Sequence, residues 1–292
     1  MADVKRSAVT PTVAQAISRI AVANSTTDAT SSFALWGGLE AVTGATNADI
    51  TGAVGTMYIC DISGYTVASK TLTLPSASVG ERLGVYISVG DPDFELILKG
   101  AASQTINGGI ATEEWSRLFI QGECVIFRCI AANTWIVEHD GRIPCVGAMR
   151  LGTTQTGVVQ GAVTAVELDS VEKERGVTCD TSASEWCIRI RRAGDYRVGV
   201  IGGPASLNNN NGIGSLTIYL NGAAQFRPAR AATHATTSQI SSSGVAIAVG
   251  LSALDELSLY AFVVNDSSSN ESFPGGAASS STAQRLFAEE IL

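Results

Sequence analysis

The stretch RLGVYISV, residues 82–89, indicates the fold class of this 292-residue protein. Its large aliphatic side chains stand at every second position: Leu83, Val85, Ile87 and Val89. Because successive side chains of a strand point to opposite faces, this period of two predicts a β-strand with one face in a core.

The same period extends to both sides of this stretch. Leu72 and Leu74 alternate with threonines and end at Pro75, and Leu96 and Leu98 repeat the pattern. A largely apolar run at 123–131 and a Trp-Ile-Val segment at 135–137 follow, and Asp140-Gly141 closes the series. Short strands with regularly spaced turn residues are typical of all-β domains. We therefore predict a β-rich module over 51–141, built as a small sandwich or barrel.

A second β module is predicted over 142–292. Its clearest strands lie at 163–168, 188–190, 196–201, 215–220, 245–249 and 257–264, separated by glycines. Two runs of small polar residues indicate exposed loops: Asn208, Asn209, Asn210 and Asn211, and a segment from Asp266 to Asn270.

Residues 1–50 differ from both modules. Thr10-Pro11 is a helix-start signal, and Val13, Ile17 and Ile20 then fall on one helical face. An isolated helix of this length is marginal in water, so its apolar stripe needs a partner. Phe33, Leu35 and Trp36 add apolar residues without a period. Two interpretations stay open: a segment folded back on its own domain, or an arm that docks on a neighbouring protein.

Composition excludes several functions. Hydrophobic residues make up 45%, charged residues 16%, and the formal net charge is −8. This content argues against disorder, and the absence of a basic run argues against nucleic-acid binding. No apolar run reaches the roughly 18 residues of a membrane helix, and Met1–Arg6 precedes no signal-peptide core. Only 4 of the 19 basic residues are Lys. Since Arg suits interfaces better than Lys, this bias indicates assembly.

No residue pattern predicts catalysis, a cofactor or a metal. His139 and His234 are the only histidines, and no nucleophile-elbow motif accompanies them. Glu113 and Glu114 precede Trp115, as in some sugar sites, but adjacent strand residues point apart and cannot flank one glycosidic bond. Acidic loops at 91–93 and 265–270 offer oxygen ligands for calcium, although solvated loops are the simpler interpretation.

Cys179 and Cys187 form one suggestive thiol pair among six cysteines. If 182–184 is a three-residue hairpin turn, these two residues stand directly opposite each other, within disulfide reach. Buried thiols remain the alternative, since the chain lacks the cysteine density of a disulfide scaffold.

Residues 144–292 carry motifs whose order resembles the trimeric jelly roll of tumour necrosis factor and the complement recognition heads. They are Gly176–Asp180 after Val171, Gly194–Val198 with its Gly-x-Tyr-x-Val pattern, Leu216–Gly222 ending in Asn-Gly, Leu251–Leu259, and Arg285–Ala288. One departure is Leu254, which stands where that family has Gly before Asp. The resemblance implies a jelly roll and a homotrimer.

Residues 57–139 resemble the β modules of bacteriophage fibre and virion-surface proteins. A strand ends in Leu-Pro at 74–75, and a glycine-initiated strand at 122–131 leads to the strand of Trp135. Together, the two resemblances imply a trimeric head fibre or capsid decoration protein of a tailed phage, made in the bacterial cytoplasm and displayed on the virion. The arm would anchor it to capsid or tail proteins through Val13, Ile17, Ile20, Phe33, Leu35 and Trp36.

Three alternatives stay open. In a receptor-binding tail fibre, Asn208–Asn211, Asp266 and Asn270 would contact a host glycan or protein. A secreted ligand of the tumour-necrosis-factor type would need a signal segment or membrane anchor. A polysaccharide hydrolase would depend on Glu113 and Glu114.

Overall fold

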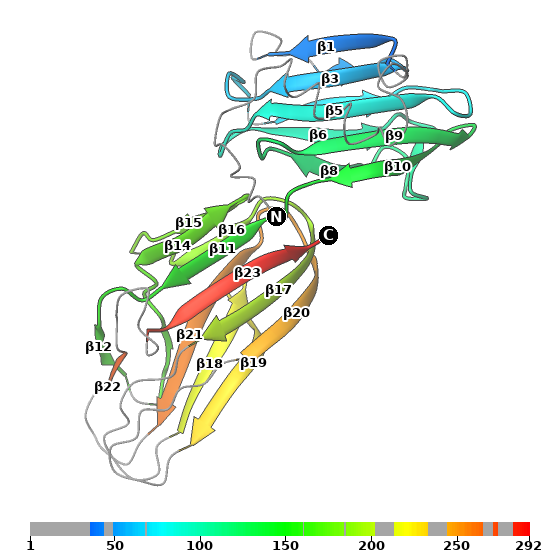
Figure 1. Ribbon diagram of the computed structural model, residues 1–292. Coiled ribbons are helices and arrows are strands. Elements are labelled where there is room, and N and C mark those ends of the chain that lie inside the picture. Colours follow the sequence, from blue (N-terminus) through cyan, green and yellow to red (C-terminus); the bar gives the residue numbers. More distant parts are fainter. Residues whose placement is uncertain are drawn as a thin grey trace, which may run out of the picture. The chain divides into compact units, whose positions relative to one another are not determined.

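The computed structural model describes residues 36–43, 49–67, 69–159, 161–183, 185–201, 213–232, 244–264, 271–273 and 283–292. These residues form strands and turns, with no helix among them. Accordingly, no described helix has the length and hydropathy to cross a membrane. The helix predicted after Thr10 lies outside the described residues. The chain divides into two compact units, Met1–Ile143 and Pro144–Leu292 (Figure 1).

The first unit contains two sheets. The strands of the six-stranded sheet are, in spatial order, β1 (Gly38–Val42), β3 (Thr56–Asp61), β5 (Arg82–Val89), β9 (Cys124–Ala131), β10 (Thr134–Gly141) and β7 (Thr105–Ile106). The strands of the four-stranded sheet are β2 (Ile50–Thr51), β4 (Ser69–Leu74), β6 (Glu95–Gly100) and β8 (Glu114–Leu118). Consecutive strands from β1 to β8 therefore alternate between the two sheets.

Strand direction gives this unit a coiled topology. β1, β3 and β5 run parallel to one another, as do β2, β4 and β6. Each consecutive pair of strands forms one coil, and three coils stack as in a short solenoid. The antiparallel pair β9 and β10 then extends the six-stranded sheet beyond β5. The prediction left a sandwich and a barrel open, and it did not include parallel pairing, because alternation is the same in parallel and antiparallel strands.

Side chains from both sheets fill the space between them. Leu72 and Leu74 of β4, Leu98 of β6, and Val85 and Ile87 of β5 are completely buried. Leu83, Val85 and Ile87 of RLGVYISV therefore face the core, as predicted from their spacing, whereas Val89 is only partly buried.

The second unit also contains two large sheets. One has the order β14 (Ser170–Arg175), β11 (Val146–Arg150), β23 (Arg285–Ile291), β17 (Gly194–Ile201) and β20 (Gly244–Leu251). The other has the order β15 (Val177–Asp180), β16 (Cys187–Ile190), β21 (Glu256–Val264), β18 (Ile213–Leu220) and β19 (Ala223–Ala232), with β13 (Val163–Ala165) paired to β21. β12 (Gln155–Val158) pairs separately with β22 (Glu271–Phe273).

The strand order of the second unit is that of a jelly roll. If β11, β16 to β21 and β23 are counted one to eight along the chain, the sheets read 1-8-3-6 and 2-7-4-5. This is the arrangement of two interleaved Greek keys. The predicted all-β jelly roll is confirmed by this connectivity, and each of the six strands predicted in this half overlaps an observed strand.

Part of the predicted arm, 1–50, pairs with the first unit. β1 pairs with β3 from Gly38 onward, and Gly37 N–H donates to the Gly55 carbonyl oxygen over 2.6 Å. Residues 36–43 therefore belong to the first unit. Their sequence gave no period because β1 is an edge strand with its middle residues exposed.

Candidate functional site

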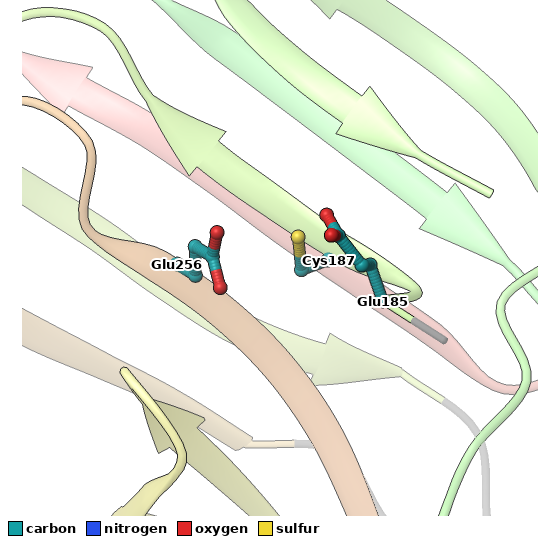
Figure 2. A group of neighbouring side chains, drawn as sticks. All are labelled: Glu185, Cys187 and Glu256. Carbon is teal, nitrogen blue, oxygen red and sulfur yellow. The ribbon is translucent and has the colours of Figure 1, made fainter. Parts of the chain in front are cut away.

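Glu185, Cys187 and Glu256 form a group of potential ligand atoms in the second unit. Their carboxyl oxygens and thiol sulfur all lie within 4.8 Å of one another. β16 begins at Cys187, directly after the turn that carries Glu185, and the register places Glu256 opposite Arg189 on neighbouring β21. Figure 2 shows the sulfur of Cys187 between the two carboxyl groups.

The guanidinium group of Arg189 is the cation of this cluster. Its Nη2 lies 2.8 Å from Oε2 of Glu185 and 2.7 Å from Oε1 of Glu256. The hydrogen bond to Glu256 raises the pKa of Arg189, so the charge persists at any ordinary pH. Burial, with Glu256 next, raises the pKa of the Cys187 thiol to about 11. A metal ion would have to displace this arginine and deprotonate this thiol, so the cluster acts as an ion-pair network.

The predicted facing of Cys179 and Cys187 is wrong by one residue. Cys179 pairs with Ile188, and Cys187 pairs with Asp180. Directly opposite residues share a face and successive ones do not, so the two thiols point to opposite faces of the sheet. All six cysteines are free and buried. The error came from the connection between the strands: β15 ends at Asp180 and β16 begins at Cys187, and the register differs by one residue from that of the assumed three-residue hairpin.

In β8, Glu114 and Trp115 both interact with arginine side chains. Both carboxyl oxygens of Glu114 accept hydrogen bonds from Arg117, at 2.6 and 2.9 Å. The Arg142 guanidinium lies 4.7 Å from the centroid of the Trp115 ring, and Phe127 contacts that ring edge-on at 5.4 Å. The ring face that would stack on a sugar is therefore taken by a cation.

Of the other polar residues considered in the sequence, some lie among the described residues and some lie outside them. His139 is exposed on β10 opposite Ile126, whereas His234 lies outside the described residues. Asp91 accepts a hydrogen bond from the Asp93 backbone N–H over 2.8 Å, which is an ordinary turn contact.

The predicted recognition loops lie outside the described residues, but the strands that flank them are described. β17, β19 and β21 all end at one end of the second unit, and β18, β20 and β23 begin there (Figure 1). Ile201 pairs with Arg285, and Ile213 pairs with both Ala232 and Val264. The connections that contain Asn208–Asn211, Asp266 and Asn270 therefore leave from the same end. The unit's first strand starts at the opposite end, where Val146 pairs with Glu289.

Of the predicted anchoring residues, Trp36 alone lies among the described residues. It packs on an apolar cluster of the first unit and is partly buried. These contacts fit the interpretation of a segment folded back on its own domain at this position, and an anchoring role of Trp36 stays a prediction. Val13, Ile17, Ile20, Phe33 and Leu35 lie outside the described residues.

An uncharged row crosses four strands on the outer face of the five-stranded sheet and ends at β14, where Ala148 pairs with exposed Lys173. Ala148 of β11 pairs with Phe287 of β23, which pairs with Gly199 of β17; the register continues to Val245 of β20. Phe287 is half-exposed, and Ile201 on the same face is 41% exposed.

The charges around this row pair with one another. Glu172 lies 3.3 Å from Arg150 and 3.1 Å from Arg285, and Arg197 lies 3.7 Å from Glu289. Between β11 and β17 the face is therefore an apolar strip bordered by paired charges, which suits the core and rim of an interface.

Several buried polar groups were missed from the sequence. Arg192 and Glu290 form an ion pair of 3.0 Å whose side chains are 1% and 2% exposed. Lys70 is 1% exposed and lies over the ring of Tyr65, 3.8 Å from its centroid. The alternation of side chains along a strand could have identified two of them. Lys70 lies on the same face of its strand as Leu72 and Leu74, and Glu290 lies on the same face as Leu286 and Ala288.

Comparisons with known proteins give weak similarities. No protein-family model matches the sequence, and a comparison with curated proteins finds no match. Among solved structures, murine APRIL at pH 8.0 is 12% identical with a TM-score of 0.36, covering 51% of this chain and 100% of its own.

Two further structures are similar at the same level. Eiger TNF from S. frugiperda is 8% identical with a TM-score of 0.36, covering 51% of this chain and 92% of its own. PRD1 vertex protein P5 is 14% identical with a TM-score of 0.33, covering 53% and 78%. Similarity at this level assigns neither a family nor a function to this chain.

Proposed function

We propose that this protein is a structural, non-catalytic component of a tailed-phage virion surface that assembles as a homotrimer through the five-stranded sheet of its jelly roll. The uncharged row through Ala148, Phe287 and Gly199 carries the proposal. A partly exposed aromatic flanked by two small residues can be buried further by another copy of the same face. The low charge content of the chain fits a surface that is partly hidden in an assembly.

The mass of the full-length protein in solution tests the trimer. We expect three chains for the natural sequence and one chain for Phe287→Asp, because the carboxylate would be buried without a partner. Tyr260→Asp is the matched control, since Tyr260 is a half-exposed aromatic on the other large sheet. A monomeric natural protein, or dissociation of the control as well, would contradict the proposal.

We further propose that the N-terminal arm attaches the trimer to the particle through Val13, Ile17 and Ile20. This extends the sequence hypothesis of a capsid decoration or head fibre with its jelly roll outward. Replacing these three residues by Asp should leave a trimer that no longer joins particles. Incorporation of that variant at the natural level would contradict the anchoring role.

A receptor-binding role is the second candidate. It is favoured by the strand ends that flank Asn208–Asn211 and Asp266–Asn270 in the sequence, because Ile201, Ile213 and Val264 lie at the end of the jelly roll opposite the start of its first strand. Purified protein should then block adsorption of the phage, and replacing the four asparagines by Ala should abolish the block. A decoration protein would leave adsorption unchanged in both cases.

A further inference from the structure

The six-stranded sheet of the first unit has an apolar outer face as well as an apolar inner one. Met57 and Ile59 of β3, Tyr86 of β5, and Cys124 and Ile126 of β9 form one cluster on it. The register confirms the shared face, since Ile59 pairs with Tyr86 and Tyr86 with Cys124. This is the face opposite to Val85 and Ile87. Exposures of only 1–9% mean that a further layer covers it.

Trp36 is the first part of that layer. Position 84, at the centre of the face, is a glycine, and a Cβ there would lie 2.8 Å from Trp36 Cη2 and 2.8 Å from Met57 Sδ. The absence of a side chain at Gly84 thus makes room for the indole ring. Among the described residues, Trp36 is the apolar side chain that packs against the cluster, and it is itself only partly buried. One indole ring is too small to cover five side chains on three strands.

We propose that Phe33 and Leu35 complete this layer within the same chain. Crossing from β3 to β9 takes two inter-strand spacings, roughly 10 Å, and an extended chain covers about 3.3 Å per residue. Three residues before Trp36 therefore suffice to reach the far strand. Residues 29–36 carry no charge, which suits burial on an apolar face.

This assignment divides the predicted arm. Phe33, Leu35 and Trp36 belong to the first unit, and Val13, Ile17 and Ile20 remain for the particle. The inference does not rest on the trimer or on the anchoring role, because it concerns only this sheet.

Cys124 offers a direct test, because it lies on the face in question, whereas Cys60 and Cys129 are completely buried. We expect maleimide to label Cys124 of the full-length protein slowly, and at least about tenfold faster in Phe33→Asp/Leu35→Asp, because its cover is lost. Cys60 and Cys129 should stay unlabelled in both proteins, which shows that the core remains folded. Val13→Asp/Ile17→Asp is the control and should not change the Cys124 rate. An unchanged rate in the first variant, or an equal increase in the control, would overturn the proposal.

A cross-link decides the matter if the double variant unfolds. With Phe33→Cys or Leu35→Cys, mild oxidation should form a disulfide to Cys124 within one chain, independent of protein concentration, since the Cα atoms must approach to about 7 Å or less. Absence of any such link overturns the assignment. A link between two chains also overturns it, and would mean that a second copy covers the face.

Discussion

Leu254 is held in a backbone conformation that suits glycine. Its φ is +76°, its side chain is 71% exposed, and its N–H donates to the Ile190 carbonyl oxygen over 2.7 Å. The left-handed region costs a non-glycine residue about 1–2 kcal/mol, and this side chain gains little by packing. Leu254 stands where the family that the sequence resembles has glycine. It thus occupies a strained backbone position in a turn that forms nevertheless.

Leu254→Gly should therefore raise the free energy of unfolding by about 1 kcal/mol, the relief of strain being partly offset by the flexibility of glycine in the unfolded chain. Urea unfolding of the second unit measures the change. Leu254→Ala is the control, because it removes the exposed side chain but keeps the strained φ. Equal stability of the two variants would show that strain is not the cause.

The buried pair Arg192–Glu290 makes a second prediction at this scale. Glu290 Oε2 also accepts a hydrogen bond from the Cys145 N–H over 2.9 Å, and the Arg192 carbonyl oxygen accepts one from the Tyr196 hydroxyl over 2.8 Å. Glu290→Gln would leave the guanidinium buried without its counter-charge and should cost about 3–5 kcal/mol of unfolding free energy.

Glu289→Gln is the matched control for that pair. Glu289 is the preceding residue on the opposite face, and its contact with Arg197 is 3.7 Å long with both side chains about half exposed. Its loss should cost less than about 1 kcal/mol. Similar losses in the two variants would contradict the assigned role of the buried pair.

At the scale of elements, one carboxylate holds the connection between β8 and β9. Glu123 is completely buried, and it accepts hydrogen bonds from the N–H groups of Phe119, Ile120 and Ile143 at 2.8, 2.9 and 3.1 Å. Glu123→Ala would remove the acceptor from all three and should cost about 3 kcal/mol, measured by urea unfolding of the first unit. Exposed Glu113→Ala should change stability by less than about 0.5 kcal/mol. A small effect of Glu123→Ala would mean that water replaces the carboxylate.

The alternation of apolar and polar residues predicted those strands in which alternate side chains are buried in a core. The alternation in β5 marks a strand because its aliphatic residues Leu83, Val85 and Ile87 lie on one face in the core, although the other face is buried as well. β19 escaped prediction because it contains Pro228 and lacks alternation. It lies at the edge of its sheet, where a proline is tolerated.

Pairing between distant strands could not be read from the sequence. The parallel coils of the first unit, and the row from Ala148 through Phe287 to Gly199, join residues far apart in the chain. The hairpin of Cys179 and Cys187 shows the same limit at short range, since a register shift of one residue puts the two thiols on opposite faces of the sheet.

At the scale of the whole molecule, the buried thiols make stability sensitive to alkaline pH. Burial raises the pKa of five thiols above the ordinary 9.0. The pKa rises to about 12 for Cys60, Cys124, Cys145 and Cys179, and to about 11 for Cys187. Between these values the unfolded chain loses protons that the folded protein retains, so stability falls as pH rises. The loss is about 1.4 kcal/mol per pH unit for each thiol. Lys70 acts in the opposite direction, because desolvation lowers its pKa and the unfolded chain then holds the extra proton.

The urea midpoint, measured with a reductant present, should therefore be constant from about pH 7 to 8.5 and fall steeply by about pH 10. Cys145 lies in the second structural unit. For that part of the protein, Cys145→Ala should reduce the slope of unfolding free energy against pH by about 1.4 kcal/mol per pH unit. The slope for the first structural unit should stay unchanged. A flat profile up to pH 10 would mean that the thiols ionise as readily in the folded protein as in the unfolded chain. That result would contradict their burial in the two β cores.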